Sequence, residues 1–329
     1  MIRNIQGLRA FAAINVVLFH IIGTASGYGF KPHILSFFEG WGANGVDIFF
    51  VVSGFVMYYT QTLSRKSVAG FYVSRLIRII PLYWLLTSLL ILIGILLPSA
   101  FNRLTLDPYS IFSSYLFLSQ ALSGGHPLLY LGWTLEYEIL FYLFFGLSII
   151  LHKDWQRLLS IFAMLTVAIA IGSSLIVYEF FWGMLLAYIF INKPRASESQ
   201  GLLILLTGAL LLSASIADEL QSLELNRIYV WGIPSIFIVA GSVYARQISS
   251  RTVLSLGDAS YSIYLVQAFT IPFFYKVAKL GDLNMSGDLL ALFCLMLSVI
   301  AGCVIHSYVE KPLTNILRGS SKNPTQAQS

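Results

Sequence analysis

The chain alternates long apolar runs with short polar segments. A helix needs about 20 mostly apolar residues to cross the hydrocarbon core of a bilayer, and ten runs reach or approach that length. The sequence therefore predicts an all-α polytopic membrane protein with about ten transmembrane helices, the sixth of them short. The predicted spans lie near residues 8–26, 44–62, 79–98, 129–151, 158–176, 177–192, 201–217, 228–245, 257–276 and 287–309.

Two segments do not fit this spanning pattern. Residues Tyr109–Leu122 are apolar but too short to span, so we predict an interfacial or re-entrant piece. After Pro312 the chain is polar, which predicts a disordered cytoplasmic tail over residues 313–329. The remaining residues 1–312 are expected to form a single transmembrane domain.

Basic residues indicate an orientation, because cytoplasmic loops carry an excess of Lys and Arg. With the N-terminus placed in the cytoplasm and the spans alternating, fifteen Lys and Arg fall inside and five outside, and together they make up the twenty of the sequence. Both termini are therefore predicted to be cytoplasmic. Because these residues act as topology signals, the net charge of +5 does not indicate nucleic-acid binding.

Composition supports the membrane assignment. Hydrophobic residues make up 57% of the chain and charged residues only 11%, whereas a soluble domain carries roughly 25% charged residues. The two cysteines, Cys294 and Cys303, lie in one apolar run on roughly opposite helix faces. They predict neither a disulfide nor a metal site.

The first span carries two polar residues, Arg9 and His20. They are eleven positions apart, so both leave the same helix face about 16 Å apart along the axis. Their presence, and the many apolar runs that follow, argue against a cleaved signal peptide. An imidazole held at depth in a bilayer indicates a functional site, although a hydrogen bond to a neighbouring helix would also explain it.

Carboxylates also lie within predicted spans, where they are costly unless they face water or a partner. Asp47 lies near the start of the second span and Glu138 is about 14 Å deep in the fourth, both within reach of the level of His20. A plain helix cap would also explain Asp47. Glu136 lies on a different helix face from Glu138, and Ser53-Gly54 predicts a close helix-packing point.

Arg75 and Arg78 precede the apolar part of the third span. They are three residues apart, so they share one helical face at its cytoplasmic end. Paired guanidinium groups suit phosphate or pyrophosphate. Anchoring to anionic lipid is the alternative interpretation.

Late in the chain, polar residues recur in two places. Their spacing over residues 257–267 predicts a lined cavity in the ninth span. Glu310 and Lys311 are adjacent near the end of the last span and, taken alone, predict an ion pair at a helix end.

Taken in their order along the chain, these motifs resemble those of the acyltransferase-3 family of integral-membrane acyltransferases, in particular its exopolysaccharide acetyltransferase branch. The resemblance covers nearly the whole chain. It rests on Arg9 and His20; the run Gly45-Val46-Asp47-Ile48-Phe49-Phe50-Val51-Val52-Ser53-Gly54-Phe55; Phe71-Tyr72 with Arg75, Arg78 and Pro81; Trp133, Leu135, Glu138 and Phe141-Tyr142; Ser260–Leu265; and Glu310-Lys311-Pro312.

The resemblance implies transfer of an acyl group, usually acetyl, from cytoplasmic acyl-coenzyme A to a glycan hydroxyl. It implies that the histidine of the first span is essential and that the Arg75–Arg78 segment binds coenzyme A. The chain departs from the family at two positions: Leu131-Gly132 and Gln267 stand where histidines are frequent. Any chemistry that depends on those histidines must be managed differently here.

We therefore expect an O-acetyltransferase of the bacterial inner membrane that acts on a polysaccharide or lipid-linked glycan, with acetyl-coenzyme A as donor and no metal. A proton-coupled exporter is the alternative. Membrane lipid, a second copy of the chain and glycan-assembly proteins are the other expected partners. The expected catalytic residues are His20, Glu138 and Asp47, the donor-binding residues Arg9, Arg75 and Arg78, and the cavity residues Ser53, Trp133, Glu136, Tyr142, Tyr261, Tyr264 and Gln267.

Overall fold

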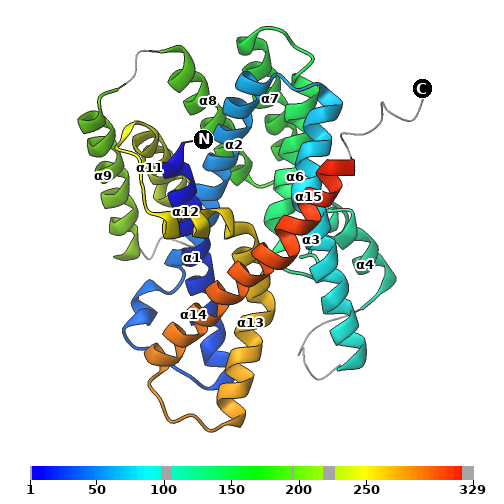
Figure 1. The fold of residues 1–329 in the computed structure, drawn as a ribbon, viewed down its shortest axis with the longest axis vertical. Helices are drawn as coiled ribbons and strands as arrows, with labels where there is room; N and C mark the ends of the chain where they lie inside the picture. Colours follow the sequence, from blue (N-terminus) through cyan, green and yellow to red (C-terminus); the bar gives the residue numbers. More distant parts are fainter. Residues whose placement is uncertain (1, 98–105, 194–195, 218–226, 321–329) are drawn as a thin grey trace.

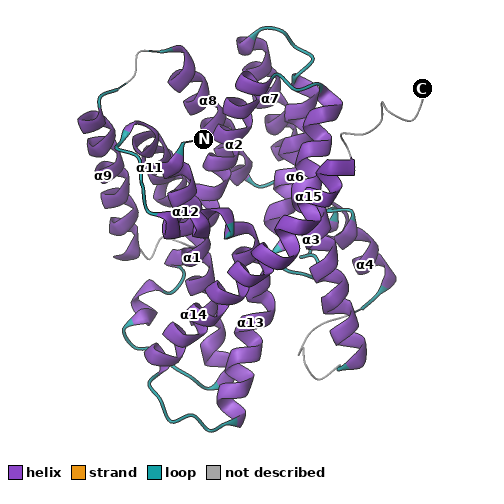
Figure 2. Ribbon diagram, in the orientation of Figure 1, coloured by secondary structure: helices purple, strands orange, loops and turns teal. Residues whose placement is uncertain are grey.

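A computed structural model describes residues 2–97, 106–193, 196–217 and 227–320. Within these ranges the chain forms helices joined by short loops and contains no β-strand (Figures 1 and 2), which confirms the all-α prediction. The α-helices are α1 (Arg3–Ala25), α2 (Asn44–Ser64), α3 (Val68–Leu96), α4 (Pro108–Tyr115), α5 (Ser119–Ser123), α6 (Gly132–Ser148), α7 (Asp154–Ala170), α8 (Tyr178–Asn192), α9 (Glu198–Ala214), α11 (Ile233–Tyr244), α12 (Arg251–Asp258), α13 (Ser260–Leu280), α14 (Gly287–Ile305) and α15 (Lys311–Ser320). There are also two π-helical turns, η8 (Ile228–Gly232) and η9 (His306–Glu310). The described 3₁₀ turns are η1 (Ser26–Tyr28), η2 (Leu35–Phe38), η3 (Trp41–Ala43), η5 (Leu175–Val177) and η6 (Ser215–Ala217).

Each predicted span falls on a helical segment. Five helical stretches of the described chain are long and apolar enough to cross a membrane, which indicates a multi-pass membrane protein. The count of ten spans and the cytoplasmic position of both termini stay predictions. The five stretches are Arg3–Tyr28, Trp41–Ser64, Val68–Leu96, Leu175–Asn192 and Gly287–Gly319.

The third helix begins well before its apolar part. The Ser67 hydroxyl accepts a hydrogen bond from the Gly70 backbone N–H at 3.1 Å, which caps the first turn of α3. The helix then runs through Pro81 to Leu96. Both arginines of the Arg75–Arg78 pair therefore project from the body of a helix.

The segment after Pro312 differs from the prediction. The chain continues from α14 through η9 into α15, which ends at Ser320. Residues 313–320 are helical rather than disordered, and residues 321–329 lie outside the described part of the chain. The predicted interfacial piece, Tyr109–Leu122, falls on two short helices, α4 and α5.

Helices α2 and α8 pack closely because each contributes a glycine at the contact. A Cβ atom on Gly54 would lie 1.9 Å from the Phe180 carbonyl oxygen, and one on Gly183 would lie 2.0 Å from the Val51 carbonyl oxygen. Neither position has room for a side chain. This contact confirms the packing point predicted from the sequence at Gly54.

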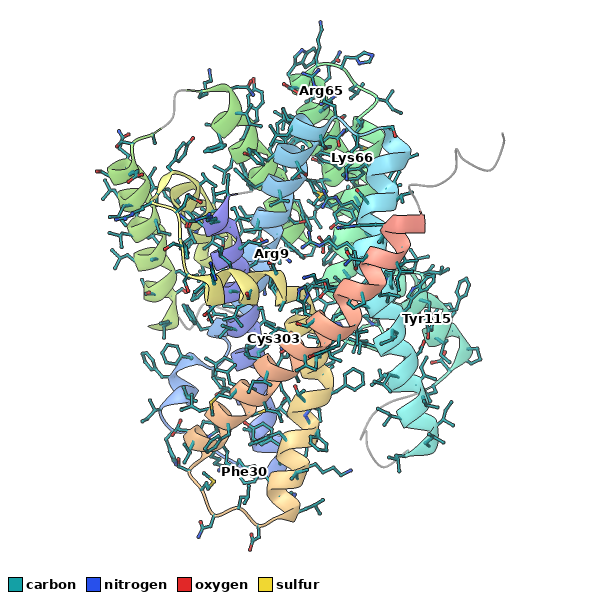
Figure 3. All side chains as sticks on the ribbon, viewed as in Figure 1. Arg9, Phe30, Arg65, Lys66, Tyr115 and Cys303 are labelled. Atoms are coloured by element: carbon teal, nitrogen blue, oxygen red, sulfur yellow. The ribbon has the colours of Figure 1, made fainter. Side chains whose placement is uncertain are left out.

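Helix α1 packs against α2, α12, α13 and α14 and so occupies the middle of the bundle (Figure 1). Helices α9 and α11 pair with each other at one side of the molecule, and α3 packs against α6 and α15 at another. Arg9 lies near the centre of the molecule (Figure 3). The residues around it form the candidate site.

Candidate active site

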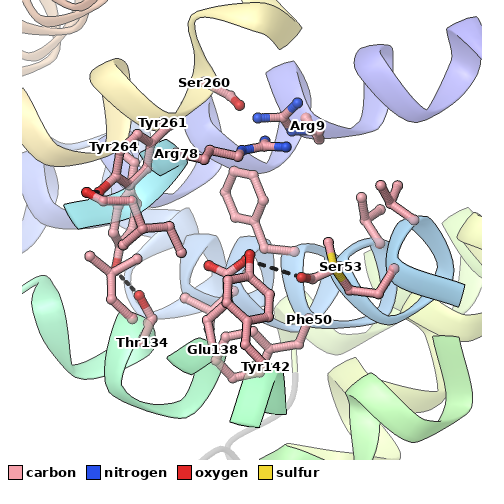
Figure 4. Close-up of a pocket in the computed structure, with 17 residues that line it drawn as sticks. Arg9, Phe50, Ser53, Arg78, Thr134, Glu138, Tyr142, Ser260, Tyr261 and Tyr264 are labelled. Carbon is pink, nitrogen blue, oxygen red and sulfur yellow. Dashed lines mark hydrogen bonds between the residues drawn. The ribbon is translucent and has the colours of Figure 1, made fainter. Parts of the chain in front are cut away.

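A cavity of about 100 Å³ lies where α1, α2, α3, α6 and α13 meet (Figure 4). Its walls combine apolar side chains with polar ones contributed by all five helices. Polar groups inside a membrane protein usually line a binding site or pathway. The polar lining residues are Arg9, Ser53, Arg78, Thr134, Glu138, Tyr142, Ser260, Tyr261 and Tyr264.

Two arginines share one wall of this cavity. Figure 4 shows the guanidinium groups of Arg9 and Arg78 next to each other, and the two are close enough to interact electrostatically. Arg9 is buried, and its Nη1 donates a hydrogen bond to Gln6 Oε1 at 3.0 Å. Gln6 Nε2 in turn donates to Asp258 Oδ1 at 2.7 Å. Because the neighbour that orients Arg9 is a neutral amide, its positive charge remains available to a ligand.

Glu138 faces these arginines from α6. Its Oε1 atom accepts hydrogen bonds from the Ser53 hydroxyl at 3.1 Å and from the Tyr142 hydroxyl (Figure 4). Both donors are neutral, and Glu138 lies within electrostatic range of Arg9. The cavity therefore has a cationic wall opposite a carboxylate whose position is fixed by two hydroxyl groups.

Among the residues that the structure describes, the His20 imidazole is hydrogen-bonded through one nitrogen only. Its Nδ1 atom lies 2.9 Å from the Val16 carbonyl oxygen and 3.1 Å from Gln267 Oε1. The Gln267 amide is oriented because its Nε2 donates to the Tyr264 carbonyl at 2.8 Å. Since both neighbours of Nδ1 are acceptors, Nδ1 carries the hydrogen. The lone pair of Nε2 is left to act as a base.

His20 does not line the cavity itself but lies farther along the same interface between α1 and α13. Tyr261 and Tyr264 of α13 line the cavity, and Gln267, about one helical turn beyond Tyr264, contacts His20. The aromatic ring of Tyr130 packs edge-on against the imidazole, with 5.3 Å between the two ring centroids. One face of α13 thus connects the cavity to His20.

The two carboxylates expected to act with His20, Asp47 and Glu138, lie elsewhere. Asp47 is fully buried and accepts hydrogen bonds from Arg227 Nη2 at 2.8 Å and Nε at 3.2 Å. Glu138 is held by hydroxyl groups in the cavity. Within the described chain neither carboxylate hydrogen-bonds to the imidazole, and Gln267 does so instead.

Three residues expected in the cavity do not line it: Gln267, Glu136 and Trp133. Glu136 accepts hydrogen bonds from the backbone N–H groups of Ser119 at 2.9 Å and Gln120 at 2.8 Å, so it fixes the start of α5 against α6. The Trp133 ring packs edge-on against Tyr137. The Glu136 carboxylate therefore accepts hydrogen bonds from the free N–H groups at the N-terminus of α5, and this structural role explains why it is buried.

The predicted pair Arg75 and Arg78 is divided between two environments. Arg78 lines the cavity. Arg75 instead donates from Nη2 to the Thr60 hydroxyl at 3.2 Å and lies over the Phe71 ring. Its Nε atom is buried with no hydrogen-bond partner among the described residues.

Sequence reasoning missed several residues of the site. The Thr134 hydroxyl lies 2.8 Å from the Tyr264 hydroxyl, and the buried Ser260 hydroxyl has no partner in the described chain. Small hydroxyl residues are common in membrane helices, so Thr134 gave no signal of its own, and Ser260 was indicated only as part of the polar segment over residues 257–267. Arg227, the partner of Asp47, was counted only as a charge outside the membrane. Within the described ranges, no group of three or more His, Cys, Asp or Glu residues could hold a metal ion.

Comparison with known proteins assigns the family. The model of a family described as "Acyltransferase domain" matches residues 2–308. The chain is 30% identical to the exopolysaccharide production protein ExoZ of Rhizobium meliloti (strain 1021), over 86% of this chain and 92% of that protein. It is 25% identical to the O-acetyltransferase OatA of Staphylococcus aureus (strain NCTC 8325 / PS 47), over 94% of this chain and 57% of that protein. No solved structure matches. With a family model matched along almost its whole length, the chain belongs to the acyltransferase-3 family of membrane acyltransferases.

Proposed function

We propose that this protein is an O-acetyltransferase of the bacterial inner membrane. It transfers an acetyl group from acetyl-coenzyme A to a hydroxyl of an exported polysaccharide or its lipid-linked precursor. Family membership and relatives named for exopolysaccharide production and O-acetyl transfer support this proposal. The observation that carries it is the anchoring of His20 through Nδ1, which leaves Nε2 free as a base.

The donor enters along the arginines. Arg9 and Arg78 attract the phosphate groups of coenzyme A, with Arg75 beside them on α3. Arg9 and His20 are separated by about 16 Å along α1, so a donor with a long pantetheine arm can be held by its phosphates while its thioester reaches the imidazole. Tyr261 and Tyr264 lie along that route.

Acyl transfer requires one base at the acceptor hydroxyl. His20 Nε2 takes the hydroxyl proton while the hydroxyl oxygen attacks the thioester carbonyl. The new C–O bond forms as the C–S bond breaks, and the imidazolium returns its proton to the departing thiolate. Gln267 Oε1 accepts the Nδ1 hydrogen throughout and stabilises the imidazolium. Alternatively, Nε2 attacks the thioester and carries the acetyl group transiently before the acceptor takes it.

The proposal is tested by label transfer. Membranes that contain the protein, and matched membranes that lack it, are incubated with acetyl-labelled acetyl-coenzyme A and a lipid-linked glycan pool. We expect label in the glycan, released by mild alkali as an ester, only where the protein is present. No transfer from any acyl-coenzyme A, together with proton-coupled movement of a small acid or glycan, would contradict the proposal and identify an exporter.

A further inference from the structure

The C-terminal helix α15 is fixed in place by the turn that precedes it. Glu310 of η9 accepts a hydrogen bond from the Ser262 hydroxyl of α13 at 2.6 Å and pairs with His306 Nδ1 at 2.8 Å, and not with Lys311 as predicted. From this anchor α15 runs across α3 (Figure 1). Helix α15 thus lies against the helix bundle through its contact with α3.

Helix α15 brings Arg318 close to two other cations. Arg318 lies within electrostatic range of Arg75 on α3 and of Lys66 in the turn between α2 and α3. That turn is fixed because Gln61 Nε2 donates to the Lys66 carbonyl at 2.8 Å. Partial burial, and the charges of Arg75 and Arg318, lower the pKa of Lys66. Three cations from three segments therefore gather at one place.

No carboxylate is in contact with these cations among the described residues. Glu138 is within electrostatic range of Arg75, but its hydrogen bonds go to hydroxyl groups of the cavity. The buried Nε–H of Arg75 also has no hydrogen-bond partner in the described part of the chain. Gathered cations repel one another unless an anion binds between them, and a free guanidinium N–H suits a phosphate oxygen. The ion pairs of the described chain are Arg157–Asp154, Arg227–Asp47 and His306–Glu310.

We propose that Lys66, Arg75 and Arg318 form one binding site for a phosphate-bearing anion, to which α15 contributes the third cation. If the proposed function holds, the occupant is the phosphorylated nucleotide end of the acyl-coenzyme A donor. From this site Arg78, one helical turn beyond Arg75, leads to Arg9 and the cavity. A phospholipid headgroup presents the same chemistry, so the experiment must distinguish the two sources.

The test measures binding without turnover. Full-length protein in phosphatidylcholine nanodiscs is titrated calorimetrically with coenzyme A and with dephospho-coenzyme A. We expect Arg318→Glu and Lys66→Glu each to raise the Kd for coenzyme A about tenfold, with a smaller change for dephospho-coenzyme A. Arg318→Lys keeps most of the affinity. Arg251→Glu, the same charge change at an exposed residue of α12, leaves it unaltered.

Parental affinity for coenzyme A in both Arg318→Glu and Lys66→Glu would overturn the donor assignment. In that case the parent and Arg318→Glu are placed in nanodiscs that contain phosphatidylglycerol, and the lipid that each protein retains is measured by mass spectrometry. Loss of bound phosphatidylglycerol in Arg318→Glu would show a headgroup site, and no loss would exclude an anion site altogether. If the parent binds coenzyme A but transfers no acetyl group, the proposed function fails while the binding site stands.

Discussion

Asp47 and Arg227 contact each other directly, whereas Arg9 and Arg78 share a cavity wall and touch no carboxylate of the described residues. In the first pair each charge is matched by the other, because Arg227 donates two hydrogen bonds to Asp47. In the cavity, the hydrogen bonds of Arg9 and Glu138 go to neutral groups. The same residue types therefore serve different purposes inside one helix bundle.

The difference follows from the cost of holding a charge away from water. A buried ion pair whose two charges neutralise each other holds together the elements that carry it, here α2 and the start of η8. Removing one partner leaves the other as an unpaired buried charge. A charge held only by neutral groups gains most from an incoming counter-charge. We therefore expect the paired charges, Asp47 and Arg227 (the closed charges), to determine stability. We expect the charges held only by neutral groups, such as Arg9 and Glu138 (the open charges), to determine activity.

The largest expected effect concerns the closed pair. Arg227→Ala leaves Asp47 buried without a counter-ion and close to Glu179, so we expect the free energy of unfolding to fall by about 3–5 kcal/mol. Denaturant unfolding in detergent measures this. The double variant Asp47→Asn with Arg227→Gln should recover most of the loss. Parental stability of Arg227→Ala would show that the pair is not a structural element.

The next effect concerns the open charges. Arg9→Gln keeps a polar side chain in the cavity but removes its positive charge, so we expect kcat/KM for acetyl-coenzyme A to fall about a hundredfold. Arg9→Lys should recover only part, because an ammonium group cannot bind phosphate in the bidentate manner of a guanidinium. Unfolding should be nearly unaffected. A large loss of stability with normal activity per folded molecule would show that Arg9 is a structural residue and does not bind the donor.

Gln267 should act through His20 without contacting substrate. Gln267→Leu removes the acceptor of the Nδ1 hydrogen, so the imidazole loses a partner that fixes its orientation. We expect kcat to fall about tenfold with KM unchanged, measured by steady-state acetyl transfer. A rise in KM at constant kcat would instead place Gln267 in substrate binding.

The smallest effect tests the support of Glu138. Ser53→Ala removes one of its two hydroxyl donors, and we expect kcat/KM to fall a few-fold and stability by about 1 kcal/mol. Ser64→Ala is the matched control, because its hydroxyl donates to the Thr60 carbonyl near the exposed end of the same helix. Equal effects on activity in the two variants would remove Ser53 from the site.

Much of the fold could be predicted because apolar runs of membrane length are a strong signal. Every predicted span falls on a helix. The first turns of α3 and the whole of α15 are not predicted, because they lie outside the long apolar runs. The position of α15 depends on the contact of Glu310 with Ser262, which joins residues far apart in the sequence.

Part of the site was predictable for a related reason, since a charge or imidazole in an apolar run needs an explanation. Arg9 and Glu138 do line one cavity. Which polar group meets which was not predictable. Asp47 pairs with Arg227, 180 residues away, and no pattern in the sequence marks that partnership.

In the proposed reaction, His20 Nε2 acts directly in acyl transfer. The most direct test compares the parent with His20→Gln in a single turnover, with labelled acetyl-coenzyme A prebound and its affinity measured separately. We predict that His20→Gln binds coenzyme A as the parent does and yet transfers no label to the glycan. Transfer at the parental rate by His20→Gln would contradict the account.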